Sequence, residues 1–318
     1  MVIEMSNCKP HMSIRAALIA AAAVSCLVVG TSQLSAANSA LTGSVQTNRP
    51  DPGAMVQPQR VETILSADDN PSVFARAGKA RDALGFPAGV KRTGRHVKDG
   101  FMKAEYDEVD EVDSAGRPLS LTEFDGSGRL TAAVRFDMPT KPAARLTGDA
   151  ASRTAQRALT LAGVTFEGAA QVEPTGSSDG WDVHWSRRLG GVPIRGDETR
   201  VRLSADGRVE SVAHVQHALA AEPKSRLDSQ AARRVVSKTA EDWFASRGSG
   251  YDVLSVDLQW VGANAAFDPN GPADPQAPYR LAWVANVKPS GAMSDYLRLV
   301  TLYIDAATGS IIGGDVIE

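Results

Sequence analysis

Cysteine is nearly absent from this 318-residue chain, which contains only Cys8 and Cys26. Both lie within the first 36 residues, a segment that we expect to be removed on export. The remaining chain would then have no disulfide bond and no cysteine-based metal or thiol chemistry.

An excess of charge of one sign is also missing. The formal net charge is −3, so no basic field favours nucleic acid or an anionic membrane surface, and we expect no nucleic-acid partner. Hydrophobic residues make up 43% and charged residues 22% of the chain, which is ordinary for a globular protein. The length is sufficient for two or three domains.

The chain has one long hydrophobic run, AALIAAAAVSCLVVG at residues 16–30. This run is short for a membrane span of roughly 20 residues. Lys9 and Arg15 provide the positive segment before it, and Ser35 and Ala36 are small residues suited to signal-peptidase cleavage. The pattern predicts that residues 1–36 are a cleaved signal peptide, that the mature protein is secreted, and that it has no membrane span.

Two alternatives remain for this N-terminal segment. The sequence AVSC at residues 23–26 resembles a bacterial lipobox, which would make the protein a membrane-anchored lipoprotein with a lipid on Cys26. The apolar LVV that follows disfavours this reading, because such a tether is usually polar. An uncleaved anchor is the second alternative, and each possibility places the folded chain outside the cytoplasm.

Four further segments follow. Residues 37–60 are rich in Ser, Thr, Asn, Gln and Pro without an apolar period, which predicts a flexible linker. Helix-start and hairpin signals then divide the chain into a first region (61–142), a second region (145–222) and a third region (225–318).

Each region is expected to contain one helix followed by antiparallel strands. Asn70-Pro71 marks the first helix start, Thr147 or Asp149 can cap a second helix through Ala162, and residues 227–230 can begin a third that extends through Phe244. The strands alternate apolar and polar residues and are separated by Gly-containing turns.

The turn segments repeat between regions. LSADGRVESV at residues 203–212 and LYIDAATGSIIG at residues 302–313 are counterparts, and EFDGSGRLTAAV at residues 123–134 is a looser third copy. The repetition predicts an α+β fold built of tandem modules, each with one helix packed on an antiparallel β-sheet.

Two of these segments resemble known families. GWDVHWSRRLGGVPIRGDETRVRLSADGRVESV, residues 180–212, resembles the propeptide module of fungalysin- and thermolysin-type metallopeptidases. Residues 277–289 and 297–317, which include Tyr-Ile-Asp-Ala-Ala-Thr-Gly at residues 303–309, resemble a PepSY domain. The resemblance covers roughly residues 145–318 and implies a PepSY/cystatin-like fold.

In the peptidase precursors such modules precede the catalytic domain, assist its folding and inhibit it. No His-Glu-x-x-His motif occurs in this sequence. The chain ends at Glu318, directly after the last predicted strand, so we expect any inhibition to act in trans.

Catalytic candidates are weak. GSSDG at residues 176–180 matches G-x-S-x-G, but it lies between two predicted strands rather than between a strand and a helix. Asp182 and His184 share a strand face, although a solvated polar face is the simpler interpretation. His214 and His217 would point to opposite faces of a strand, and such spacing disfavours a shared metal.

The remaining polar features are simpler still. His96 is isolated, the acidic run at residues 105–113 lacks the calcium-loop pattern, and residues 267–274 form a turn-rich segment. Solvated charge is the expected role of the two acidic segments. We therefore predict that the protein is not an enzyme and has no cofactor and no metal site.

The leading prediction is a secreted, non-catalytic binding or regulatory protein. Its partner would be a secreted peptidase or a cell-envelope protein, and it would act as a peptidase inhibitor in trans or as a chaperone-like module. The interaction would use a sheet face or an exposed edge strand. The alternative is an extracytoplasmic small-ligand or signal-binding module whose pocket is lined by Trp181, Trp185, Trp260 and Trp283; an unrecognised hydrolase is a third reading.

Overall fold

The computed structural model describes residues 60–99, 104–137, 146–175, 180–264 and 277–317. The predicted signal peptide, most of the predicted linker, and the turn-rich segment 267–274 lie outside these residues. Among the helices in the described ranges, none combines the length and apolar character needed to cross a membrane.

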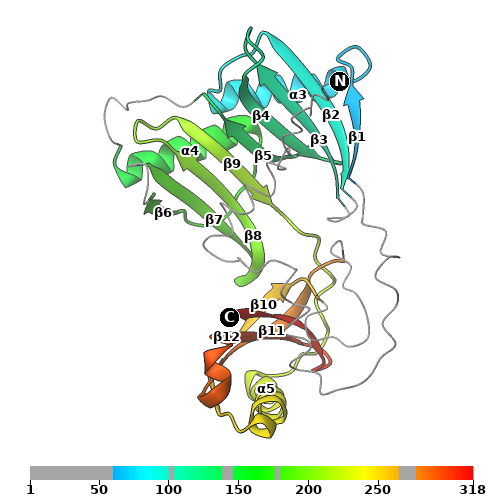
Figure 1. Ribbon diagram of the computed structural model, residues 1–318, viewed down its shortest axis with the longest axis vertical. Coiled ribbons are helices and arrows are strands. Elements are labelled where there is room, and N and C mark those ends of the chain that lie inside the picture. Colours follow the sequence, from blue (N-terminus) through cyan, green and yellow to red (C-terminus); the bar gives the residue numbers. More distant parts are fainter. Residues whose placement is uncertain (1–59, 100–103, 138–145, 176–179, 265–276, 318) are drawn as a thin grey trace, which may run out of the picture. The chain divides into compact units, whose positions relative to one another are not determined.

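The protein is an α+β protein in which one helix followed by four antiparallel strands occurs three times (Figure 1). An additional strand, β1 (Arg60–Leu65), precedes the first helix. The first region contains α3 (Pro71–Leu84), β2 (Lys91–Asp99), β3 (Ala104–Val112), β4 (Pro118–Asp125) and β5 (Leu130–Arg135). The second contains α4 (Gly148–Ala162), β6 (Gln171–Pro174), β7 (Trp181–Leu189), β8 (Val192–Leu203) and β9 (Val209–Val215). The third contains α5 (Ser229–Phe244), β10 (Tyr251–Val261), β11 (Arg280–Pro289), β12 (Leu299–Asp305) and β13 (Ile311–Ile317), with short 3₁₀ turns at Ala245–Arg247 and Gly291–Asp295.

The helices begin where their capping residues predict. The Thr147 side chain accepts a hydrogen bond from the Ala150 N–H at 3.3 Å, and the Asp228 carboxylate accepts one from the Ala231 N–H at 2.7 Å. Each bond satisfies an N–H that the first helical turn leaves without a partner. α3 instead begins with Pro71, whose missing N–H costs nothing at that position.

One leucine of α4 does not belong to the core. Leu161 is apolar, but 52% of it is exposed. Leu159 on the same helix is fully buried, as are Ala151 and Ala155. Two residues along a helix are about 200° apart, so Leu159 and Leu161 cannot share one narrow apolar face.

The first two regions share one sheet and one core. β5 pairs with β9 in antiparallel register, from Ala132↔Ala213 to Val134↔Ser211. Helices α3 and α4 lie on the same side of these strands (Figure 1) and contact each other. The buried side chains beneath them form one cluster, which includes Phe74, Val109, Phe124, Leu159, Val183, Trp185, Val201 and Val212.

The third region has a core of its own. α5 packs against β10 and β11, with Val236, Ala240 and Phe244 buried beneath it. The link to β8 is a single parallel bridge, Trp260↔Ile194. A small apolar cluster of Ile194, Trp260, Leu281 and Ala306 surrounds this bridge.

Two hairpin turns of the first region share the same side-chain chemistry. The Asp113 carboxylate accepts hydrogen bonds from the N–H groups of Ala115 and Arg117, and Asp125 does the same for Ser127 and Arg129. In each turn the arginine side chain also donates back to the aspartate. A glycine with positive φ, Gly116 at 76° and Gly128 at 81°, precedes the arginine in both turns.

The third-region counterpart lacks this arginine. Asp305 instead accepts from the backbone of Ala307 and Thr308 inside its turn. Its second carboxylate oxygen lies 2.5 Å from the guanidinium of Arg280 at the start of β11. These contacts make the turn motif a scaffold feature.

The acidic run at residues 105–113 is not the solvated charge that we expected. It forms most of β3, and Glu108 and Glu111 are buried. Glu111 lies 2.9 Å from Arg81 of α3 and 3.1 Å from Arg92 of β2, so it joins the helix to the sheet. The sequence shows only a run of acidic residues, because the two arginine partners of Glu111 lie 19 and 30 positions before it.

Candidate functional site

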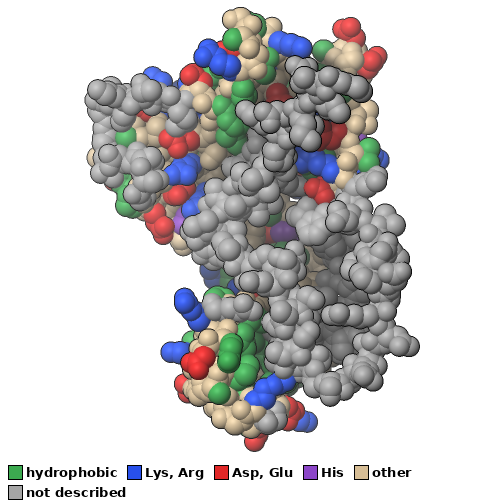
Figure 2. All heavy atoms as spheres, in the orientation of Figure 1, with side chains coloured by type: hydrophobic (Ala, Val, Ile, Leu, Met, Phe, Trp, Pro, Cys, Tyr) green, Lys and Arg blue, Asp and Glu red, His purple; other side chains and the backbone are tan. Residues whose placement is uncertain are grey.

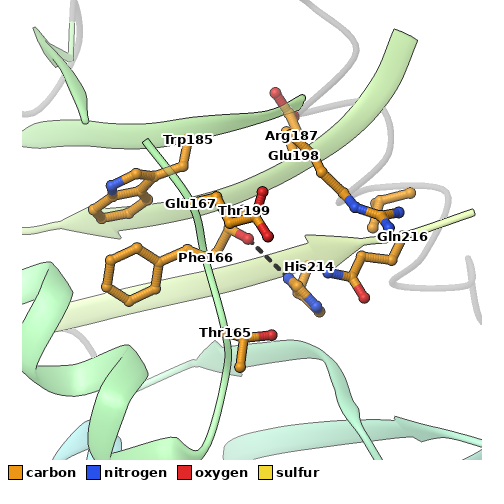
Figure 3. A pocket seen from close by; sticks show the side chains of 10 residues that line it. Thr165, Phe166, Glu167, Trp185, Arg187, Glu198, Thr199, His214 and Gln216 are labelled. Atoms are coloured by element: carbon orange, nitrogen blue, oxygen red, sulfur yellow. Dashed lines mark hydrogen bonds between the residues drawn. The ribbon is translucent and has the colours of Figure 1, made fainter. Parts of the chain in front are cut away.

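A small polar hollow lies at one end of β7, β8 and β9 (Figure 3). The loop between α4 and β6 covers it through Phe166, whose ring centroid is 4.7 Å from that of Trp185. Its volume is about 30 Å³, roughly the space that one water molecule occupies in the liquid. Ten residues line it: Thr165, Phe166, Glu167, Trp185, Arg187, Glu198, Thr199, His214, Val215 and Gln216.

A hydroxyl–imidazole pair forms the buried wall of the hollow. The Thr199 hydroxyl lies 2.8 Å from Nδ1 of His214, which is the dashed contact in Figure 3. Burial lowers the pKa of His214, with a smaller contribution from the Arg129 charge. A neutral imidazole next to a hydroxyl is the minimum arrangement for nucleophilic catalysis, yet a hollow of this size cannot admit an ester or a peptide.

A buried carboxylate lies beside this hollow. The Asp197 side chain is fully buried and accepts a hydrogen bond from the Arg187 guanidinium at 2.9 Å. It also accepts from the His217 backbone N–H at 3.1 Å and lies 2.5 Å from Nδ1 of the His217 ring. Several donors therefore compensate the desolvation of one charge, as a buried carboxylate requires.

The third region contributes a tyrosine to the same cluster. Nε2 of His217 lies 3.2 Å from the Tyr279 hydroxyl, and the two rings stack with centroids 4.1 Å apart. Burial, and then the Asp197 charge, raises the pKa of Tyr279 to about 12. The phenol therefore keeps its proton at neutral pH and acts as a hydrogen-bond donor rather than a nucleophile. We refer to Arg187, Asp197, His217 and Tyr279 as the junction cluster.

A second polar contact joins the same two regions. Arg195 lies 3.1 Å from Asp315 and stacks over the Tyr303 ring at 5.6 Å. The Tyr303 hydroxyl donates to Asp315. Burial, and then the Asp315 charge, raises the pKa of Tyr303, so this phenol also stays protonated.

The four predicted pocket tryptophans are not gathered around one hollow. Trp185 lies in the core shared by the first two regions, and Trp181 packs against it while donating to the Leu146 carbonyl at 3.1 Å. Trp260 is buried at the β8–β10 bridge, and Trp283 donates to the Leu227 carbonyl at 3.1 Å. Trp185 is the one of the four that lines the hollow of Figure 3.

The other sequence candidates have scaffold partners. Asp182 pairs with Arg200 at 3.1 Å, and His184 Nε2 lies 2.6 Å from the Gln171 amide oxygen, so the two do not form a dyad. Residues 176–179 of the GSSDG segment lie outside the described ranges. His96 is not isolated, since its Nδ1 lies 2.9 Å from Asp107.

The described residues hold no group of three or more potential ligands from His, Cys, Asp and Glu. His214 and His217 do not occupy opposite faces of one strand, because β9 ends at Val215 and the chain turns toward Asp197.

Sequence reasoning missed Arg187, Asp197 and Tyr279. In the sequence, Arg187 and Asp197 are polar residues within alternating segments, and Tyr279 directly precedes an apolar run. The bend at Gly196, whose φ is +80°, lies next to Asp197 and offered the one local signal. Alternation could not reveal the cluster, because its members are up to 92 residues apart in the chain.

No family model matches the chain, and no curated protein matches it. Two solved structures resemble it weakly. The Bacillus megaterium YpeB C-terminal domain has a TM-score of 0.40 at 14% identity, over 80% of this chain and 98% of that one. An uncharacterized protein from Eubacterium rectale has a TM-score of 0.37 at 11% identity, over 79% of this chain and 86% of that one. Similarity at this level carries no argument about function, and the propeptide and PepSY resemblance stays a prediction.

Proposed function

We propose that the protein is an extracytoplasmic, non-catalytic binding or regulatory protein whose partner is another protein. A secreted peptidase or a cell-envelope protein is the proposed partner class. The predicted signal peptide at residues 1–36 would direct the export of this protein.

One observation carries this proposal: the polar side chains of the junction cluster form hydrogen bonds with one another. The Asp197 carboxylate contacts Arg187 and the His217 ring, and the other nitrogen of that ring contacts the Tyr279 hydroxyl. Thr199 and His214 face a hollow of about 30 Å³, whereas pockets for small organic molecules occupy roughly 300–1,000 Å³. The hollow at Thr199 and His214 therefore supports neither turnover nor a small organic ligand, which favours a role for this site other than catalysis; a larger hollow of about 270 Å³ lies elsewhere, between α3, α4 and the turn before β9.

The visible surface agrees with a protein partner. Figure 2 shows Lys and Arg side chains mixed with Asp and Glu over the described residues, so neither sign dominates this face. A surface of mixed charge suits recognition by complementarity of shape and local charge rather than by a bulk field.

The first experiment is affinity capture of proteins from the culture supernatant, followed by reconstitution with the purified partner. We expect a specific partner, and slower substrate cleavage if that partner is a peptidase. Failure to recover any partner would count heavily against the proposal.

The second experiment tests the enzyme reading directly. The purified chain is assayed against ester and peptide substrates beside His214→Gln and the near-isosteric Thr199→Val. We expect no activity above background in any of the three. Hydrolysis by the natural chain that both substitutions abolish would overturn the proposal.

A further inference from the structure

The strands at the ends of the described sheet are protected to different degrees. β6 has four residues and ends in Pro174, which cannot donate to a neighbouring strand. β10 has a register shift at Leu254 and meets β8 at one bridge. Short length, proline and bulges are common ways to prevent unwanted strand pairing.

β13 is protected by a side-chain clamp. Asn264 donates through its side-chain amide to the Gly314 carbonyl at 2.8 Å and accepts from the Gly314 N–H at 2.9 Å. The Asn264 backbone N–H also donates to the Ile312 carbonyl at 3.0 Å. A further strand would have to displace these bonds.

Among the described residues, β1 has no proline, no bulge and no side-chain clamp of this kind. Its sequence, RVETIL, contains no proline, glycine or lysine, and all six residues pair with β2 without a register shift. In the described part of the chain, β2 is its only strand neighbour. Val61 is 51% exposed and Ile64 is 69% exposed, which is unusual for apolar residues on a sheet edge.

The side chains of β1 divide between the two sheet faces. Val61, Thr63 and Leu65 share the face that α3 covers, since Leu65 packs against the shared core. Glu62 and Ile64 lie on the opposite face. A twofold axis normal to the sheet relates two identical antiparallel strands without exchanging the two sheet faces. Residues directly opposite each other must therefore come from the same face, which requires one residue of β1 to lie opposite its own copy, at the axis.

Two axis positions, Glu62 and Thr63, each pair five of the six residues of β1, and every other position pairs three or fewer. An axis at Glu62 would place two like charges opposite each other, which is unfavourable. An axis at Thr63 pairs Thr63 with its own copy, Val61 with Leu65 and Glu62 with Ile64 of the second copy, so no like charges lie opposite each other.

We propose that β1 is a self-association surface and that its partner is β1 of a second copy of this chain, antiparallel and centred on Thr63. Pairing of one short strand buries less surface than the about 1,200 Å² typical of stable interfaces, so the dimer is expected to be weak and concentration-dependent. This surface lies apart from the hollow and the junction cluster, and the proposed function does not depend on it.

Disulfide crosslinking can test this pairing, because the chain contains only two cysteines that must be replaced. In a full-length chain carrying Cys8→Ser and Cys26→Ser, Thr63→Cys introduces a single thiol. Cross-strand Cα atoms lie about 4.5–5.5 Å apart, within disulfide reach. We expect Thr63→Cys to form a disulfide-linked dimer under mild oxidation.

Two matched variants locate the axis. Glu62→Cys would place the equivalent thiols on a diagonal, about 7–8 Å apart, so its dimer should form at least ten times more slowly. Arg153→Cys, on the exposed surface of α4, controls for random collision. Fastest crosslinking by Glu62→Cys, or equal crosslinking by Thr63→Cys and Arg153→Cys, would refute the proposed pairing.

Sedimentation of the natural chain over a concentration series provides an independent readout. Ile64→Lys places a charge at the exposed edge and should raise the dimer dissociation constant at least tenfold. Leu161→Lys, at an exposed leucine of α4, should leave it unchanged. A natural chain that stays monomeric at all concentrations, or that pairs β1 with a different protein instead, overturns the proposal.

Discussion

The two connections between neighbouring regions are built in opposite ways. The first and second regions merge: β5 and β9 pair, α3 and α4 touch, and one apolar cluster serves both. In the described residues, the second and third regions meet through two parallel β-bridges, Trp260↔Ile194 and Leu219↔Tyr279, together with a small apolar cluster and two polar side-chain contacts. The same order of elements therefore produces a shared core at one connection and a junction of isolated bridges and a few side-chain contacts at the other.

The difference follows from the strands that meet. Ala132, Ala133 and Val134 of β5 face Ala213, Val212 and Ser211, which are small residues that allow two regular edges to approach along their length. β8 bends at Gly196 and meets β10 only at Trp260. Extended pairing buries apolar area on both faces, whereas two isolated bridges bury less, and side-chain hydrogen bonds complete the junction.

The largest expected effect is at the shared core. Leu159→Ala removes a fully buried side chain and should cost about 4 kcal/mol of unfolding free energy. Because the core is shared, amide hydrogen exchange should accelerate in α3 and β2–β5 as well as in α4. Leu161→Ala is the control and should change stability by no more than about 0.5 kcal/mol. Faster exchange confined to the second region would show that the two regions do not share one core.

The next effect is at the junction cluster. Asp197→Ala removes the carboxylate that accepts from the Arg187 guanidinium and the His217 N–H, at a cost of about 3 kcal/mol, although Arg187 keeps its hydrogen bond to the His217 carbonyl. Limited proteolysis should then cut the segment between β9 and α5 sooner, while exchange in the shared core stays slow. Asp252→Ala removes an exposed carboxylate of β10 and should have no such effect. Unchanged proteolysis in Asp197→Ala would refute a stabilising role for the cluster.

The smallest effect is a pH dependence in the second region. His214 has a lowered pKa in the folded protein, so the unfolded chain takes up its proton first as the pH falls. Its contribution to stability is complete above the ordinary histidine pKa, about 6.5, and is lost as the pH falls through the folded value. For one proton the slope cannot exceed about 1.4 kcal/mol per pH unit.

Denaturant unfolding between pH 7.5 and pH 5 measures this dependence. His214→Gln should flatten it, whereas His184→Gln, at a histidine bonded to Gln171 on the opposite sheet face, should retain it. An identical pH dependence in His214→Gln and the natural chain would exclude His214 as its source.

Much of the fold could be predicted from local pattern. The helix starts at Pro71, Thr147 and Asp228 and the Asp–Gly turns depend on contacts within a few residues, so the sequence displays them directly. β2 is hard to predict because KRTGRHVKD at residues 91–99 is highly charged and lacks clear alternation. Its charges are satisfied across the sheet, for example by Arg95 with Asp110 at 2.5 Å, and such pairs cannot be read before the register is known.

The candidate site was much less predictable. Trp185 belonged to the predicted set and lines the hollow, but Thr199 and Asp197 were read as positions in an alternating strand. Their chemistry arises from the bend of β8 and from the arrival of His217 and Tyr279, which are 20 and 82 residues further along the chain than Asp197.

The sequence by itself determined the α+β class, the helix-and-strand plan of its regions and the turns that close their hairpins, because capping, alternation and positive-φ glycines act over a few residues. Only the tertiary structure decided that the first region follows the plan of the other two, which regions merge, where the acidic strand is neutralised, and which strand of the described sheet has a single strand neighbour. These features depend on strand register and on contacts between residues that are distant in the sequence. Such contacts decide whether a given glutamate or leucine lies in water, in an ion pair or in the core.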